Sequence, residues 1–173
     1  NPSSAAVTIS GTTFPSAKLT LLKDGTIVTT LIANNDGSFI IVVNGLNYGT
    51  YQFSVYAEDR NGIVSSPHVL NVPVYAVQGY TYNGIILPPT IQASTTIVGP
   101  SQGVVISGYA AAGATVLIEV PGVSSIGSSV ADSSGFYRYE VRQFLSPGLY
   151  PFRAKAYMGI YESMYSKPVS ILY

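Results

Sequence analysis

Few side chains in this sequence could act in acid–base or nucleophilic chemistry. His68 is the single histidine, and catalysis by it would need a nucleophile and an orienting acid close by. The sequence contains neither a Gly-x-Ser-x-Gly motif nor a Gly-x-x-x-x-Gly-Lys phosphate loop. Because the chain has no cysteine, thiol catalysis and thiolate metal sites are excluded. We therefore expect a protein that is not an enzyme and uses no cofactor, with His68 on the surface or at an edge strand.

The richest cluster of carboxylates is Glu58-Asp59. With oxygen ligands from adjacent loops, Glu58 and Asp59 are the candidates for a calcium site. The alternative is a turn without metal, because the following Asn61-Gly62 suits the positive φ of tight turns. The corresponding segment of the second half, Tyr157-Met158-Gly159-Ile160, lacks the acids. We therefore expect no bound metal here.

Tyrosine is abundant, with 14 residues. Tyr157, Tyr161 and Tyr165 precede the expected last strand. Tyrosine rings offer an amphipathic contact surface at low entropic cost, so these three are candidates for contact with a partner protein or a sugar. Packing inside the modules or between them is the alternative for these tyrosines.

The composition limits the classes of partner. Charged residues make up 9% of the 173 residues and the net charge is zero, against about 25% charged residues in an average domain. Nucleic acid binding is not expected without a basic patch, and no apolar run reaches the ~18 residues of a membrane span. A weakly charged surface is poorly protected against association. We therefore expect the partners to be other protein modules or further copies of this chain.

An internal repeat organises the chain. Val7-Thr8-Ile9-Ser10-Gly11 recurs as Val104-Val105-Ile106-Ser107-Gly108, and Ala33-Asn34-Asn35-Asp36-Gly37 recurs as Ala131-Asp132-Ser133-Ser134-Gly135. The spacing between the copies stays nearly constant along the sequence. Such self-similarity predicts two copies of one structural unit.

Within each unit, apolar residues alternate with polar ones in short runs between turn residues, which predicts strands. β-branched and aromatic residues dominate these runs, and the fold class is all-β. In the second unit the pattern predicts strands near 90–93, 104–109, 115–120, 124–130, 135–142, 149–157 and 168–173. In the first unit it predicts strands near 6–10, 18–22, 26–32, 38–43, 50–58 and 69–77.

These ranges predict the domain boundaries. Module 1 spans residues 1–78, with its first strand short or missing, and module 2 spans residues 90–173. A missing strand would leave an open edge in module 1 that a strand from another chain could fill. Residues 79–89 are expected to form a linker stiffened by Pro88-Pro89. Ile85, Ile86 and Leu87 within it are expected to be buried between the modules.

One motif occurs twice before the penultimate strand of each unit, as Leu46/Gly49/Tyr51 and Leu145/Gly148/Tyr150. It resembles the tyrosine corner of Greek-key sandwiches, in which the hydroxyl of Tyr51 or Tyr150 bonds back to the main chain. With the Ile-Ser-Gly and Asp-Gly motifs, the chain resembles tandem bacterial Ig-like modules.

That resemblance implies two tandem Ig-like Greek-key β-sandwiches in an exported, extracellular or cell-surface protein. Such modules serve as stalks, spacers, adhesive units or assembly modules and carry no catalytic residues. The alternatives are a subunit of a self-assembling extracellular filament or pilus, joined by strand complementation, and a module that binds cell-surface glycans through exposed tyrosines.

Overall fold

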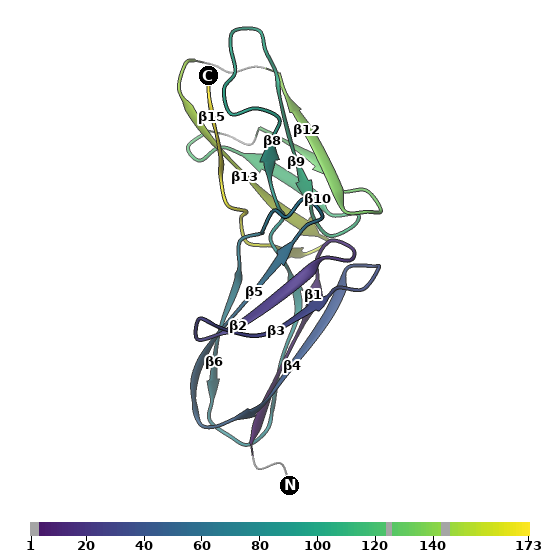
Figure 1. The fold of residues 1–173 in the computed structure, drawn as a ribbon, viewed down its shortest axis with the longest axis vertical. Coiled ribbons are helices and arrows are strands. Elements are labelled where there is room, and N and C mark those ends of the chain that lie inside the picture. The colour runs from purple at the N-terminus through teal and green to yellow at the C-terminus, as the bar shows by residue number, and fades with distance from the viewer. Residues whose placement is uncertain (1–3, 124–125, 143–145) are drawn as a thin grey trace.

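The computed structural model describes residues 4–123, 126–142 and 146–173. All regular elements in this part are β-strands, in two groups along the long axis of the molecule (Figure 1). The first group comprises β1 (Ala5–Thr12), β2 (Lys18–Lys23), β3 (Thr26–Ile32), β4 (Ser38–Leu46), β5 (Gly49–Glu58), β6 (His68–Val74) and β7 (Gly79–Ile86). The second comprises β8 (Gln92–Ala93), β9 (Val104–Tyr109), β10 (Thr115–Glu119), β11 (Gly127–Val130), β12 (Phe136–Val141), β13 (Leu149–Met158), β14 (Tyr161–Glu162) and β15 (Val169–Leu172).

Each group forms a sandwich of two sheets. In module 1 the strand orders are β4-β1-β7 and β3-β2-β5-β6. In module 2 they are β12-β9-β8 and β11-β10-β13, with β14 and β15 both pairing with β13. Consecutive strands that cross between two facing sheets are the mark of the Ig-like sandwich. The chain is therefore all-β, with two tandem Ig-like modules, as the repeat predicts.

The predicted alternation of apolar and polar residues along the strands identifies the side chains that form the core of each module. On β5, Phe53, Val55 and Ala57 point inward and are fully buried. Their counterparts on β13 are Phe152, Ala154 and Ala156, which are buried to the same degree. Side chains of a strand alternate between its faces, so one row of each strand enters the core and the other faces outward. The parts of the predicted repeat at Ser124 and Leu145 lie outside the described residues.

The segment 79–89 differs from the predicted linker. Gly79–Ile86 forms β7, which pairs in parallel with β1 from Ala6↔Gly79 to Thr12↔Ile86. Tyr80 holds this strand in place: its ring is buried, and its hydroxyl accepts hydrogen bonds from the Tyr75 and Ala76 amides, both at 2.9 Å. Module 1 therefore extends to Ile86, and the connection to module 2 begins at Leu87.

The open edge that a missing first strand would leave beside β1 is filled by the same strand, β7. In module 2, β8 lies beside β9 as the first strand, in antiparallel orientation. In module 1, β7 lies at the equivalent place beside β1 but runs in the parallel direction. The missing first strand is thus replaced from the other end of the same module, and the slot is occupied without another chain.

The repeated Ile-Ser-Gly motif has a packing reason. A Cβ atom added at Gly11 would lie 2.0 Å from the carbonyl oxygen of Ile85 on β7. A Cβ added at Gly108 would lie 2.0 Å from the carbonyl oxygen of Thr90. Each glycine therefore lets a neighbouring main chain come closer than any side chain would allow.

β7 also decides how the modules meet. Because β7 carries the chain back along module 1 after β6, the two modules meet through equivalent ends of their sandwiches. The β1–β2 loop and β3–β4 turn of module 1 lie opposite the β9–β10 loop and β11–β12 turn of module 2 (Figure 1). Gly135 on the β11–β12 turn is so close to Phe14 that an added Cβ would lie 2.8 Å from the Phe14 Cβ. The start of β1 and the end of β15 lie at opposite ends of the molecule (Figure 1).

Candidate functional site at the junction of the modules

Three apolar residues join the two cores. Ile85, Ile86 and Leu87 are all buried. Ile85 and Leu87 pack in the core of module 1, whereas Ile86 packs in the core of module 2. The Leu87 amide donates to the Thr12 carbonyl at 3.0 Å. Successive residues of one short segment therefore pack in the cores of different modules. This packing fixes the position of the segment between the two modules.

A buried polar network crosses the junction. The Thr90 hydroxyl donates to a carboxylate oxygen of Asp59 at 2.6 Å and accepts from the Tyr109 amide at 3.0 Å. The Tyr137 hydroxyl donates to the Thr90 carbonyl at 2.6 Å. Thr90 and Asp59 are only 1% and 6% exposed, and burial raises the pKa of Tyr137 far above its ordinary value. Each of these hydrogen bonds holds polar groups that would be costly to leave unpaired.

Aromatic side chains surround this network. Tyr109 packs against Phe14 of module 1 with ring centroids 5.9 Å apart, and against Phe136 of module 2 at 5.5 Å. The Arg60 guanidinium of module 1 lies over the Tyr109 ring, 5.0 Å from its centroid. The contact thus combines aromatic packing with a cation–π interaction, both of which add to simple area burial.

Glu58 and Asp59 do not form a common site. Glu58 lies 3.5 Å from Lys18 in an exposed ion pair, whereas Asp59 points into the junction. One oxygen of Asp59 accepts from the Asn61 and Ile63 amides at 2.9 and 3.0 Å, and the other accepts from Thr90. The Asp59 carboxylate therefore closes its own turn and ties it to module 2. In the part of the chain that the structure describes, no group of three His, Asp or Glu side chains gathers.

A groove of about 520 Å³ opens at the side of the junction. Ile85 and Ile86 of module 1 line it together with Tyr157, Met158 and Tyr161 of module 2. Tyr161 lies against Gly84 on β7, where an added Cβ would come within 3.1 Å of the Tyr161 ring. The structure thus brings two of the three candidate tyrosines to one concave surface shared by both modules.

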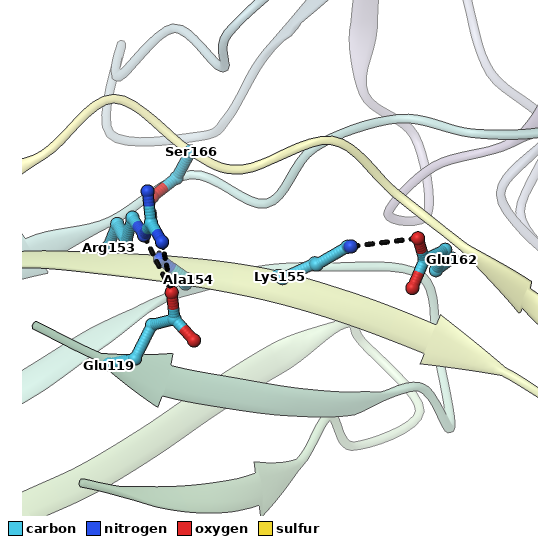
Figure 2. A network of polar contacts seen from close by, with 6 residues as sticks. All are labelled: Glu119, Arg153, Ala154, Lys155, Glu162 and Ser166. Atoms are coloured by element: carbon cyan, nitrogen blue, oxygen red, sulfur yellow. Dashed lines mark hydrogen bonds and ion pairs between the residues drawn. The ribbon is translucent and has the colours of Figure 1, made fainter. Parts of the chain in front are cut away.

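Tyr165 lies outside the groove lining, in a row of charged side chains on β10 and β13. The Arg153 guanidinium bonds Glu119 and stacks on the Tyr165 ring at 3.7 Å, and Lys155 pairs with Glu162 at 2.8 Å. Figure 2 shows the Arg153–Glu119 and Lys155–Glu162 pairs side by side. Burial alone would raise the pKa of Glu119, but hydrogen bonds from Arg153 and Tyr165 hold it below its usual value. The Tyr165 ring is therefore engaged in a salt-bridged surface network.

The two corner tyrosines occupy equivalent positions. The Tyr51 hydroxyl donates to the Asn47 carbonyl at 3.1 Å, and the Tyr150 hydroxyl donates to the Ser146 carbonyl at 2.7 Å. Both rings are half-buried, so each hydrogen bond ties the start of β5 or β13 to the preceding turn.

His68 stands apart from these contacts. It begins β6 opposite Val55 on β5, and its Nδ1 is buried without a hydrogen-bond partner among the described residues. Burial lowers the pKa of His68 and so favours the neutral ring. No carboxylate among the described residues is hydrogen-bonded to this Nδ1.

Sequence reasoning missed Thr90, Tyr109 and Tyr137 as junction residues. For Thr90, the sequence offered one indication of this role, namely its position directly after Pro88-Pro89. A residue that follows such a stiff connection is expected to contact one of the flanking modules. Nothing in the alternation of β9 or β12 distinguishes Tyr109 and Tyr137 from other core residues.

No family model matches this sequence, and no curated protein is similar enough to count as a relative. Solved structures of similar fold include fibronectin(III)-like modules of Clostridium thermocellum CbhA, with 19% identity over 92% of this chain and 78% of that chain and a TM-score of 0.36. The D00–D0 domain of intimin shows 14% identity over 96% and 98%, with a TM-score of 0.39. The BSP domain of a biofilm-associated protein shows 18% identity over 90% and 25%, with a TM-score of 0.38. Because these identities and TM-scores are low, the Ig-like assignment rests on the strand order of the chain itself.

Proposed function

We propose that this chain is a non-catalytic tandem Ig-like segment of an exported bacterial surface protein, acting as a semi-rigid spacer that holds its two ends apart. The buried junction carries the proposal. Ile86 enters the core of module 2, and Asp59 of module 1 receives the Thr90 hydroxyl in a buried hydrogen bond. Both contacts would be lost if the modules turned freely.

The resemblance to tandem bacterial Ig-like modules supports the exported location, and the absence of cysteine is compatible with it. The part of the chain that the structure describes contains no helix with the length and hydropathy needed to cross a bilayer. Filament assembly through an unfilled slot in module 1 loses its support, because β7 fills that slot.

A distance measurement tests the spacer. The chain has no cysteine of its own, so Tyr48→Cys and Thr96→Cys place one spin label on an exposed loop of each module. We expect a single narrow distance distribution in pulsed electron paramagnetic resonance, because the junction fixes the orientation of the modules. A broad distribution of distances would show independent modules and contradict a semi-rigid spacer.

The groove favours a second candidate function, the binding of a cell-surface glycan. Tyr157 and Tyr161 line the same concave surface as Ile86, and aromatic rings stack on the apolar faces of sugars. We expect Tyr157→Ala to weaken saccharide binding about tenfold, equivalent to the loss of roughly 1.4 kcal/mol. The control is Tyr48→Ala, which removes an exposed ring outside the groove. Equal binding by both variants, or none by the wild type on a glycan array, would argue against this function.

A further inference from the structure

One edge of module 1 lacks the features that usually protect a sheet edge. β4 ends the three-stranded sheet, and no described strand pairs with its outer side. Its nine residues contain no charge and no proline. Phe39, Ile41 and Val43 face the core, while Ile40 and Val42 point outward and are 63% and 52% exposed. A long, uncharged, apolar edge is a template for pairing with another strand.

Module 2 shows that the fold does not require aliphatic side chains on the outer face of this edge strand. Ile40 on β4 lies opposite Ser10 on β1, as Arg138 on β12 lies opposite Ser107 on β9. One step along, Val42 pairs with Thr8. The equivalent pair on β12 and β9 is Glu140 and Val105. The same outward positions thus carry aliphatic side chains in module 1 and charged ones in module 2. The exposed aliphatic pair is a property of module 1 and not of the Ig-like sandwich.

We infer that module 1 associates with module 1 of a second copy of this chain by antiparallel pairing of β4 with β4. With a two-fold axis at Ile41, Ile40 of each copy lies opposite Val42 of the other, and two three-stranded sheets become one. Ile and Val are enriched in strands because they pack well against cross-strand neighbours, and side chains directly opposite each other in an antiparallel pair make the closest such contacts. The register is self-complementary, as a two-fold interface requires.

A second copy fits this edge better than a charged partner. The neighbouring outward positions are also uncharged: Thr8 and Ser10 on β1, and Thr81 on β7. A charged strand would therefore find no counter-charge on this face and would lose hydration without compensation. A neutral strand with its own free edge satisfies the unpaired main-chain groups of β4, and β4 of another copy is such a strand. The inference goes beyond the spacer function, since a spacer can work as a monomer.

Sedimentation of the full chain over a range of concentrations up to about 1 mM tests the dimer. We expect reversible dimerisation of the wild type. Ile40→Lys with Val42→Lys should weaken it at least about tenfold, because like charges would then lie directly opposite each other. The matched control is Thr81→Lys with Asn83→Lys, which adds the same charge at exposed positions on β7, the other edge of the sheet. This control should dimerise like the wild type.

The charged residues of β12 indicate that the lysine variant will fold, and a thermal melt checks this. Hydrogen exchange on the wild type gives an independent readout, because raising the concentration should protect the amides of β4. The inference is overturned if the wild type stays monomeric up to about 1 mM. It is also overturned if β4 gains no protection, or if Val28→Lys with Thr30→Lys on the β3 edge abolishes the dimer while the β4 variant leaves it intact. None of these outcomes affects the distance test of the spacer.

Discussion

Gly11→Ala is expected to lower the free energy of unfolding of module 1 by about 3 kcal/mol, because it forces a side chain into the path of β7. The new Cβ would lie 2.0 Å from the Ile85 carbonyl oxygen and 2.8 Å from its carbon. Main-chain atoms cannot rotate away as a side chain can, so β7 must separate from β1. The pairs Gly11↔Ile85 and Thr12↔Ile86 would be lost first.

Hydrogen exchange read by mass spectrometry measures this effect strand by strand, which suits a chain of two modules that need not unfold together. We expect faster exchange in β1 and β7 and little change in β10 and β13. Gly79→Ala is the matched control on β7, since an added Cβ there meets no atom within 4 Å. It should change the stability by less than about 0.5 kcal/mol. If Gly11→Ala were as stable as this control, β7 would not occupy the first-strand slot.

The failure to predict β7 from the sequence has a physical cause. Tyr80 and Tyr82 alternate with Thr81 as strand residues do, but Gly79 and Gly84 frame them as a loop. Comparison with the second repeat does not reveal this strand, because β8, which precedes β9 in the chain, lies at the equivalent place in module 2. A parallel partner is also invisible to local patterns, because it depends on where a distant strand lies. By contrast, an antiparallel hairpin such as β2–β3 can be predicted from adjacent residues, here the turn Asp24-Gly25 and the strands on either side of it.

The junction was only partly predictable for a related reason. Burial of Ile85, Ile86 and Leu87 follows from their apolar character in a short connection. The role of Asp59 does not follow, because a carboxylate beside Asn61-Gly62 predicts the same turn whether or not another module covers it. Only the return of the chain along β7 places that turn against Thr90. The sequence therefore allowed either a calcium site at Glu58 and Asp59 or a turn without metal, and favoured the turn, but it did not predict that Asp59 accepts a hydrogen bond from the other module.

Thr90→Val is expected to lower the free energy of unfolding by about 3 kcal/mol, because it removes the hydroxyl at the centre of the junction. The substitution keeps the shape of the side chain but leaves a buried oxygen of Asp59 and the Tyr109 amide without their partner. Hydrogen bonds to charged groups are the stronger ones, and an unpaired buried carboxylate is costly. The loss should also uncouple the modules, so that a single melting transition broadens or splits in calorimetry.

Thr13→Val is the matched control, since it makes the same replacement at an equally buried threonine. The Thr13 hydroxyl has no hydrogen-bond partner among the described residues, and both threonines are 1% exposed. Removing an unpaired buried hydroxyl should be neutral or slightly stabilising. The difference between the two variants therefore reports the hydrogen bonds of Thr90 and not the loss of a hydroxyl in general. Equal stabilities of the two variants would mean that the Asp59–Thr90 contact does not hold the modules together, and the semi-rigid spacer would lose its main support.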